Sequence, residues 1–263
     1  MASAGEVTLR DAFYFSGTTF FTLGLGDLSP GSGFGRTLTV VESGLGFAFL
    51  AAVIGYLPVL YQAFSRREIS VSMLDARAGS PPTAGELLRR HGAAEDPEVL
   101  SRLLSDWERW AAEVLESHLS YPILSFFRSQ HQNQSWITGL TAILDTSALL
   151  MVSGHPGVRR EAELAFRVGR HAVVDLAQTI WVWPRQAEVE RLSREDLDRL
   201  RPTLEENAVP GANDPELWDK LLKLRLLYEP YVCTIAELLL MQVPQWMPAE
   251  GAQDDWATSP WEV

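Results

Sequence analysis

The sequence predicts an all-α protein with a membrane-embedded N-terminal part and a helical C-terminal part. The first observation behind this fold class is the run Leu38–Phe64, which is apolar except for one ionisable residue, Glu42. The second is the spacing of apolar residues after residue 97, which recurs every three and four positions, as on one face of a helix. Strand-like alternation is scarce, so a sheet is not expected.

Leu9–Phe21 predicts a helix that is too short to cross a bilayer. It is followed by Thr22-Leu23-Gly24-Leu25-Gly26-Asp27, in which two glycines alternate with apolar residues. Glycine adopts backbone conformations that are closed to most residues, so consecutive carbonyls of this stretch can face one side. Several copies around an axis would line it with carbonyl oxygens, which can replace the hydration shell of a potassium-sized cation. The negative end of the short helix would also favour a cation.

The run Leu38–Phe64 predicts a membrane-spanning helix. At a rise of about 1.5 Å per residue it reaches about 40 Å, and a hydrocarbon core is about 30 Å thick. A buried core helix is the alternative, but its length and near absence of charge argue against it. Arg66 and Arg67 follow the run, which predicts a cytoplasmic C-terminal region. Glu42 needs a partner or a wet position at this depth. We expect a bond to Thr18 or Thr19; snorkelling to the outer interface is the alternative.

These residues resemble the potassium channel family with a two-helix pore unit, and specifically its small prokaryotic members. The family signature Thr-Val-Gly-Tyr-Gly-Asp corresponds to Thr22–Asp27, and the aromatic pair before it to Tyr14-Phe15. The pattern Leu-x-Pro followed by Gly-Arg corresponds to Leu28-Ser29-Pro30 and Gly35-Arg36, and the family's hinge glycine to Gly46. The resemblance covers about residues 10–65.

The resemblance implies a homotetramer in the cell membrane that conducts K⁺ through a carbonyl-lined filter, with no cofactor beyond the permeant ion. The residues expected in the filter are Thr22, Leu23, Gly24, Leu25 and Gly26. Those expected to support it are Asp27, Thr18, Thr19 and Glu42. Gating is expected to bend the inner helix at Gly46, Gly55 or Pro58, since proline removes a backbone hydrogen bond.

Three departures from the family pattern keep alternatives open. Leu25 replaces a tyrosine and cannot make the hydrogen bond that helps fix the filter width, so a weakly selective cation channel is one alternative. Phe21 replaces the first of two threonines. The family's outer helix is not seen before Asp11, so we expect a start further upstream. A non-conducting, membrane-anchored interaction or sensor protein with a remnant pore loop is the other alternative.

The composition of the remaining chain predicts a polar linker over 65–97, a helical cytoplasmic domain for assembly or gating over 98–250, and an acidic tail over 251–263, after the pore unit of 8–64. The helices expected in this domain include Trp136–Val152, Gly157–Val182, Leu192–Leu204 and Asp214–Met241. The first of these is expected to be buried although it contains Asp145. The last is expected to have Asp214 as its N-cap and to be bent or divided at Pro230. Tryptophans including Trp107, Trp181 and Trp183 are expected in a core or between subunits.

The bulk composition limits the function further. The formal net charge is −12, and an acidic chain lacks the basic footprint that nucleic acid requires, so no nucleic-acid partner is expected. The one cysteine, Cys233, excludes an intrachain disulfide and is expected to be a small buried hydrophobic residue. Neither a Walker, a zinc-protease nor a Ser-His-Asp pattern is present, so we do not expect an enzyme.

Overall fold

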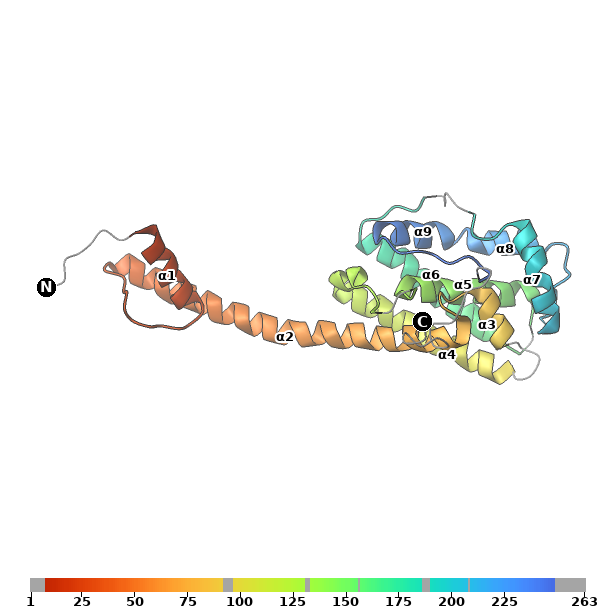
Figure 1. Ribbon diagram of the computed structural model, residues 1–263, viewed down its shortest axis with the longest axis horizontal. Helices are drawn as coiled ribbons and strands as arrows, with labels where there is room; N and C mark the ends of the chain where they lie inside the picture. The colour runs from red at the N-terminus through yellow and green to blue at the C-terminus, as the bar shows by residue number, and fades with distance from the viewer. Residues whose placement is uncertain are drawn as a thin grey trace, which may run out of the picture. The chain divides into compact units, whose positions relative to one another are not determined.

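The computed structural model describes residues 8–91, 97–130, 133–155, 157–185, 190–207 and 209–248 (Figure 1). Within these ranges the ordered elements are helices and no strand occurs, which confirms the all-α fold. The chain divides into two compact units, with the boundary between Gln62 and Ala63. The expected acidic tail, 251–263, lies outside the described residues.

The first unit contains helix α1 (Leu9–Phe20) and the N-terminal part of helix α2 (Gly33–Ala78). Helix α1 begins with a capping box: the Thr8 hydroxyl accepts from the Asp11 N–H at 3.3 Å, and the Asp11 carboxylate accepts from the Thr8 N–H at 3.0 Å. Such a box satisfies two N–H groups that a helix start leaves unpaired. The predicted short helix is therefore present almost as expected.

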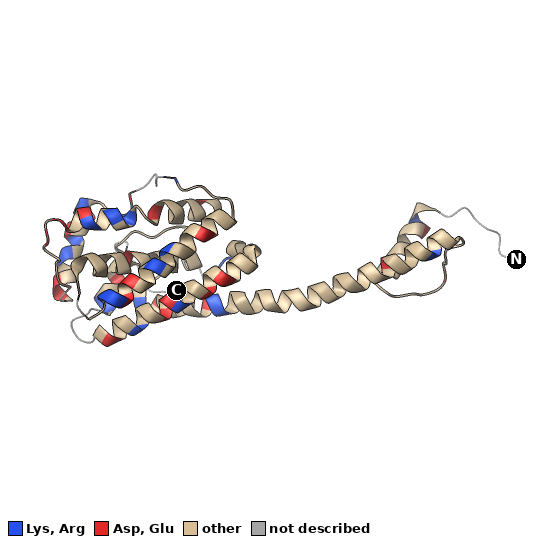
Figure 2. Cartoon of the chain, turned by 180° about the vertical axis from the view of Figure 1, so that it is seen from behind, with Lys and Arg blue, Asp and Glu red and all other residues tan. Residues whose placement is uncertain are grey.

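Helix α2 is longer than the apolar run that predicted it, and it continues through Pro58. Figure 2 shows that its charged residues lie toward its ends, while its middle carries none. Side chains such as Phe47, Ile54 and Leu57 are exposed, because no protein core covers them in this chain. A long helix with an apolar surface suits a hydrocarbon environment.

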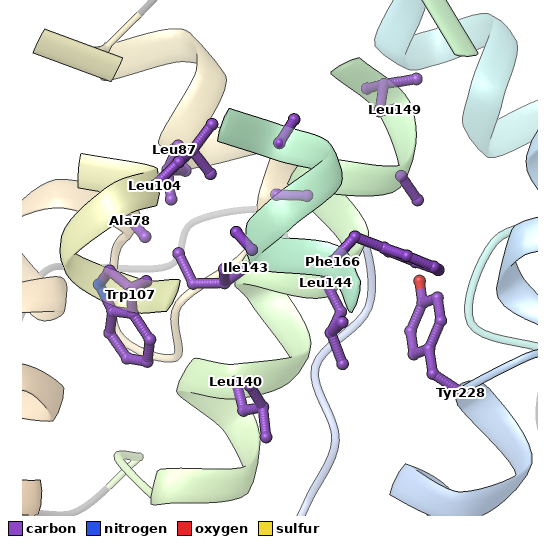
Figure 3. Packing of buried hydrophobic residues seen from close by; sticks show 14 of the residues in the cluster. Ala78, Leu87, Leu104, Trp107, Leu140, Ile143, Leu144, Leu149, Phe166 and Tyr228 are labelled. Atoms are coloured by element: carbon purple, nitrogen blue, oxygen red, sulfur yellow. The ribbon is translucent and has the colours of Figure 1, made fainter. Parts of the chain in front are cut away.

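The second unit is a helical domain built around α5 (Trp136–Ser153). Figure 3 shows Ile143 and Leu144 of α5 between Trp107 on one side and Phe166 and Tyr228 on the other. Among the described residues, α5 and α2 are the helices apolar and long enough to cross a membrane, but 89% of the apolar window of α5 is buried inside the unit. The expectation of a buried helix is thus confirmed. The other elements are the end of α2, α3 (Ala84–Arg90), α4 (Pro97–Ser120), the 3₁₀ helix η1 (Pro122–Phe126), α6 (Arg159–Thr179), α7 (Arg194–Glu206), α8 (Leu217–Arg225) and α9 (Glu229–Leu238).

The segment 65–97 differs from the expected polar linker. Its first part extends α2 to Ala78, and α3 follows after a short turn. Val71, Leu74, Leu87 and Leu88 are all buried in the core of the second unit. These apolar residues are spaced for a helix, and their burial outweighs the polar composition around them.

The expected helix Asp214–Met241 is divided into two helices, which agrees with the predicted bend or division at Pro230. Helix α8 ends at Arg225 and α9 begins at Glu229, with Pro230 in its first turn, where a missing N–H costs nothing. Asp214 is not the N-cap as expected, because α8 starts after Glu216; the Asp214 carboxylate instead accepts from the Glu216 N–H at 2.8 Å.

The tryptophans divide into two groups. Trp107, Trp110 and Trp136 are buried in the core, as expected. Trp181 and Trp183 are not in this core, since they are 86% and 79% exposed. Cys233, expected to be a small buried hydrophobic residue, is partly buried.

Candidate functional site: the pore loop and its supports

In the loop after α1, residues with positive φ angles alternate with residues whose φ angles are not positive. Thr22, Gly24 and Gly26 have φ angles of 56°, 56° and 76°, all in the left-handed region, whereas Leu23 and Leu25 between them do not. This alternation allows the carbonyls of consecutive residues to face the same side, while the side chains of Leu23 and Leu25 lie exposed in the single chain. The alternating φ angles are those that the predicted carbonyl-lined filter requires.

Thr22 adopts a conformation that is costly for a residue with a branched side chain, by about 1–3 kcal/mol. Three hydrogen bonds to the end of α1 hold the loop in place. The Thr22 N–H donates to the Thr19 carbonyl at 3.0 Å, and the N–H groups of Leu23 and Gly24 donate to the Thr18 carbonyl at 2.8 and 3.3 Å. Thr18 and Thr19 thus contact the loop through their backbone carbonyls, while the Thr18 hydroxyl donates to the Phe15 carbonyl at 3.0 Å.

The far end of the loop lies near α1. The hydroxyl of Tyr14 interacts with the carboxylate of Asp27. The sequence pattern marked both positions separately, Tyr14 as one of the aromatic pair and Asp27 as the end of the signature, but it did not pair them.

Glu42 has a different partner from the one expected. Its carboxylate accepts a hydrogen bond from the hydroxyl of Ser16, not from Thr18 or Thr19. Ser16 lies in α1 and Glu42 in the first part of α2, so the bond joins the two helices of the first unit. A partly buried carboxylate with a hydroxyl donor is better solvated by the protein than one left in the apolar face.

Gly46 is the point where α1 meets α2. A Cβ atom placed on Gly46 would lie 1.8 Å from the Phe20 carbonyl oxygen, so the close approach requires glycine. Gly55 is different, because a Cβ there would have nothing within 4 Å. The hinge roles of Gly46, Gly55 and Pro58 stay predictions, but Gly46 has a packing role that the sequence did not reveal.

The domain beyond Gln62 contains a buried arginine with several hydrogen-bond partners, which the sequence did not predict. The guanidinium of Arg67 is buried and donates to the carbonyls of Leu124 and Phe127 at 2.9 and 2.6 Å, and its Nη1 lies 3.1 Å from Nε2 of His118. Burial first, and then the nearby Arg67 charge, lower the pKa of His118 from 6.5 to about 3. His118 is thus a neutral core residue. Among the described residues, no cluster of His, Cys, Asp and Glu side chains could hold a metal ion.

The comparisons with known proteins agree with the pore-loop geometry. Residues 2–62 match a family model described as "Ion channel". The chain is 28% identical over 181 residues to the "Uncharacterized membrane protein YdjJ" of Bacillus subtilis (strain 168). That match covers 67% of this chain and 51% of the relative, so the chain spans about half the length of the curated protein it matches. No solved structure matches significantly. The chain is accordingly a membrane protein whose N-terminal segment is similar to ion-channel pore regions.

Proposed function

We propose that residues 8–64 supply one subunit's share of a potassium-selective pore, assembled from four copies of the chain. The carbonyls of Thr22, Leu23, Gly24 and Leu25, together with the Thr22 hydroxyl, coordinate dehydrated K⁺ in single file. The observation that carries this proposal is the alternation of left-handed residues at Thr22, Gly24 and Gly26. Without it, successive carbonyls would point in opposite directions, as in an ordinary strand.

The supports of the loop favour a filter of fixed shape. Its inner part is hydrogen-bonded to the carbonyls of Thr18 and Thr19, and Asp27 at its outer end interacts with Tyr14. Selectivity between ions of one charge requires oxygen atoms held at defined positions or in defined number. The three hydrogen bonds at the inner part favour selective conduction over weak selection among cations.

The domain from Ala63 onward would lie in the cytoplasm and serve assembly or gating. Arg67 supports this role, because one buried guanidinium fixes the end of the inner helix to η1 through two carbonyls. A movement of that helix end would require η1 to move with it, since breaking the bonds leaves a buried charge unpaired.

The test is K⁺ flux from liposomes that contain the purified full-length gene product, followed by reversal potentials with K⁺ and Na⁺ on opposite sides. We expect K⁺ efflux and a reversal potential set by K⁺. Equal permeability to the two ions would favour the weakly selective channel. No flux from protein that is folded and reconstituted would favour the non-conducting membrane-anchored protein.

A matched pair of glycine variants tests the filter itself. Gly24 has a φ of 56°, and a Cβ there would have open space but a strained backbone, at a cost of about 1–2 kcal/mol. Gly31 also has open space, but its φ lies outside the left-handed region. We therefore expect Gly24→Ala to abolish or strongly reduce K⁺ flux and Gly31→Ala to retain it. Equal flux from both variants would refute the assignment of the filter.

A further inference from the structure

One end of the second unit exposes several large apolar side chains. Trp181, Leu240 and Trp183 are 86%, 83% and 79% exposed, and Phe126, Ile123 and Leu119 are about half exposed. We call these six residues the apolar end. They come from three separate parts of the chain, namely the α4–η1 region, the residues after α6 and the residues after α9. A soluble protein seldom leaves such a group uncovered.

Hydrogen bonds bring two of these parts together. Arg128, just after η1, donates from Nη2 to the Leu239 carbonyl at 3.0 Å and also to the Leu240 carbonyl. At the start of α5, the Thr138 hydroxyl donates to the Gln242 carbonyl at 3.0 Å. The residues after α9 therefore lie beside both η1 and the first turn of α5.

The third part reaches the same end through a helical hairpin. Helices α5 and α6 pack against each other and are joined by a short connection, so the end of α6 returns to the level where α5 begins. Trp181 and Trp183 follow directly after α6. The Arg185 N–H then donates to the Thr234 hydroxyl of α9 at 3.1 Å. Figure 1 shows η1 and the end of α6 at one end of this unit.

The apolar end lies where the chain leaves the membrane-spanning run. The ring of Phe64, the last residue of that run, is 5.9 Å from the ring of Phe127 in a T-shaped contact. Arg67, three residues later, holds the same segment through the Phe127 carbonyl at 2.6 Å. Phe127, which directly follows η1, therefore lies beside Phe64.

Charges of both signs surround this end. Arg66, Arg128 and Arg185 are exposed there, and so are the carboxylates of Glu113, Glu116 and Glu237. Tryptophan is favoured where hydrocarbon meets headgroups, because its ring is apolar and its N–H is polar. Arginine beside it is suited to phosphate groups.

We propose that the apolar end is a bilayer-contacting surface. Trp181, Trp183, Phe126 and Leu240 insert into the interfacial region of the leaflet from which Arg66 emerges, and the three arginines meet the lipid phosphates. This surface holds the domain against the membrane independently of whether the pore conducts. The inference rests on the membrane-spanning helix and the contacts of the second unit, not on the proposed ion selectivity.

Spin-label accessibility tests this proposal in the full chain. With Cys233 changed to Ser, single cysteines are introduced as Trp183→Cys, Leu240→Cys and, as control, Asp198→Cys on the exposed surface of α7. Each variant is labelled with a nitroxide and reconstituted in phosphatidylethanolamine–phosphatidylglycerol vesicles. Collisions with oxygen, which concentrates in the bilayer, are compared with collisions with a water-soluble nickel chelate.

We expect the oxygen-to-nickel ratio to be several-fold higher at positions 183 and 240 than at 198. A ratio at 183 and 240 equal to that at 198 in vesicles would overturn the proposal. So would protection from both reagents with dipolar broadening between labels, since that result indicates a contact between copies. The two labelled positions lie in different segments, so misfolding of one variant leaves the other as a test.

Discussion

Changing Gly46 to alanine is the sharpest test of how the first unit is built. A Cβ at this position would lie 1.8 Å from the Phe20 carbonyl oxygen, where ordinary contacts begin at 3.4 Å. The difference, 3.4 minus 1.8, means that the end of α1 must retreat by about 1.6 Å. Overpacking of this kind costs about 1–3 kcal/mol. The loop residues bonded to Thr18 and Thr19 must move with the end of α1.

Hydrogen exchange in reconstituted protein measures this cost locally. A loss of about 1–3 kcal/mol corresponds to about 5- to 150-fold faster exchange, which we expect in peptides that cover Leu9–Leu23. Gly44→Ala and Gly55→Ala are matched controls, because a Cβ at either position has nothing within 4 Å. Peptides of α5 serve as an internal standard. If all three variants exchange equally, close packing at Gly46 does not require glycine. Bending of the helix at a hinge would then explain better why glycine occupies this position.

Three further predictions concern titration, burial and the contact between helices. His118 has a pKa of about 3 in the folded protein and 6.5 when unfolded, so only the unfolded chain takes up this proton between these values. The unfolding free energy should therefore fall by up to about 1.4 kcal/mol per pH unit as the pH drops from 6.5 toward 3. The variant His118→Gln should flatten this slope in urea titrations followed by tryptophan fluorescence. An unchanged slope would place His118 in water. Asp145→Asn removes one of two carboxylates that contact the buried Arg191, whose other partner, Glu229, stays at 3.0 Å. Because the buried guanidinium keeps only part of its hydrogen bonding, the change should cost about 2–3 kcal/mol. Glu163→Gln in the exposed pair with Arg167 should cost at most about 1 kcal/mol, and equal losses in the same titration would contradict this. Ser16→Ala and Glu42→Ala should be non-additive by about 0.5–3 kcal/mol in a double-mutant cycle read by exchange of α1 amides, whereas additive effects would mean that the two side chains do not interact.

The parts of the fold that follow from one local pattern were predictable. The apolar run gave α2, the Thr-Leu-Gly-Leu-Gly string predicted a specialised loop, and the turn residues around Pro230 indicated a division of the last helix. Each of these depends on residues that are neighbours in the chain. Their physical cause is local: helix-compatible apolar spacing, glycine at left-handed positions, and proline in the first turn of a helix.

The parts that depend on pairing across the chain were not predictable. Composition indicated a linker at 65–97, yet Leu74 and Leu87 are covered by helices that come much later. Ser16 rather than Thr18 or Thr19 meets Glu42, because the rotation of α1 against α2 decides which hydroxyl faces the carboxylate. The Tyr14–Asp27 pair and the buried Arg67 likewise need a fold before their partners are known.

The burial of α5 has a consequence for biosynthesis. This helix is as long and as apolar as a membrane-spanning helix, and it is synthesised after α2. Three of the helices that cover it, α6, α8 and α9, are synthesised afterwards. Asp145 lies within α5, and a carboxylate at mid-helix adds about 2.5–3.5 kcal/mol to the cost of insertion. The same residue that later pairs with Arg191 therefore biases the nascent segment toward the aqueous side, where its domain can fold around it.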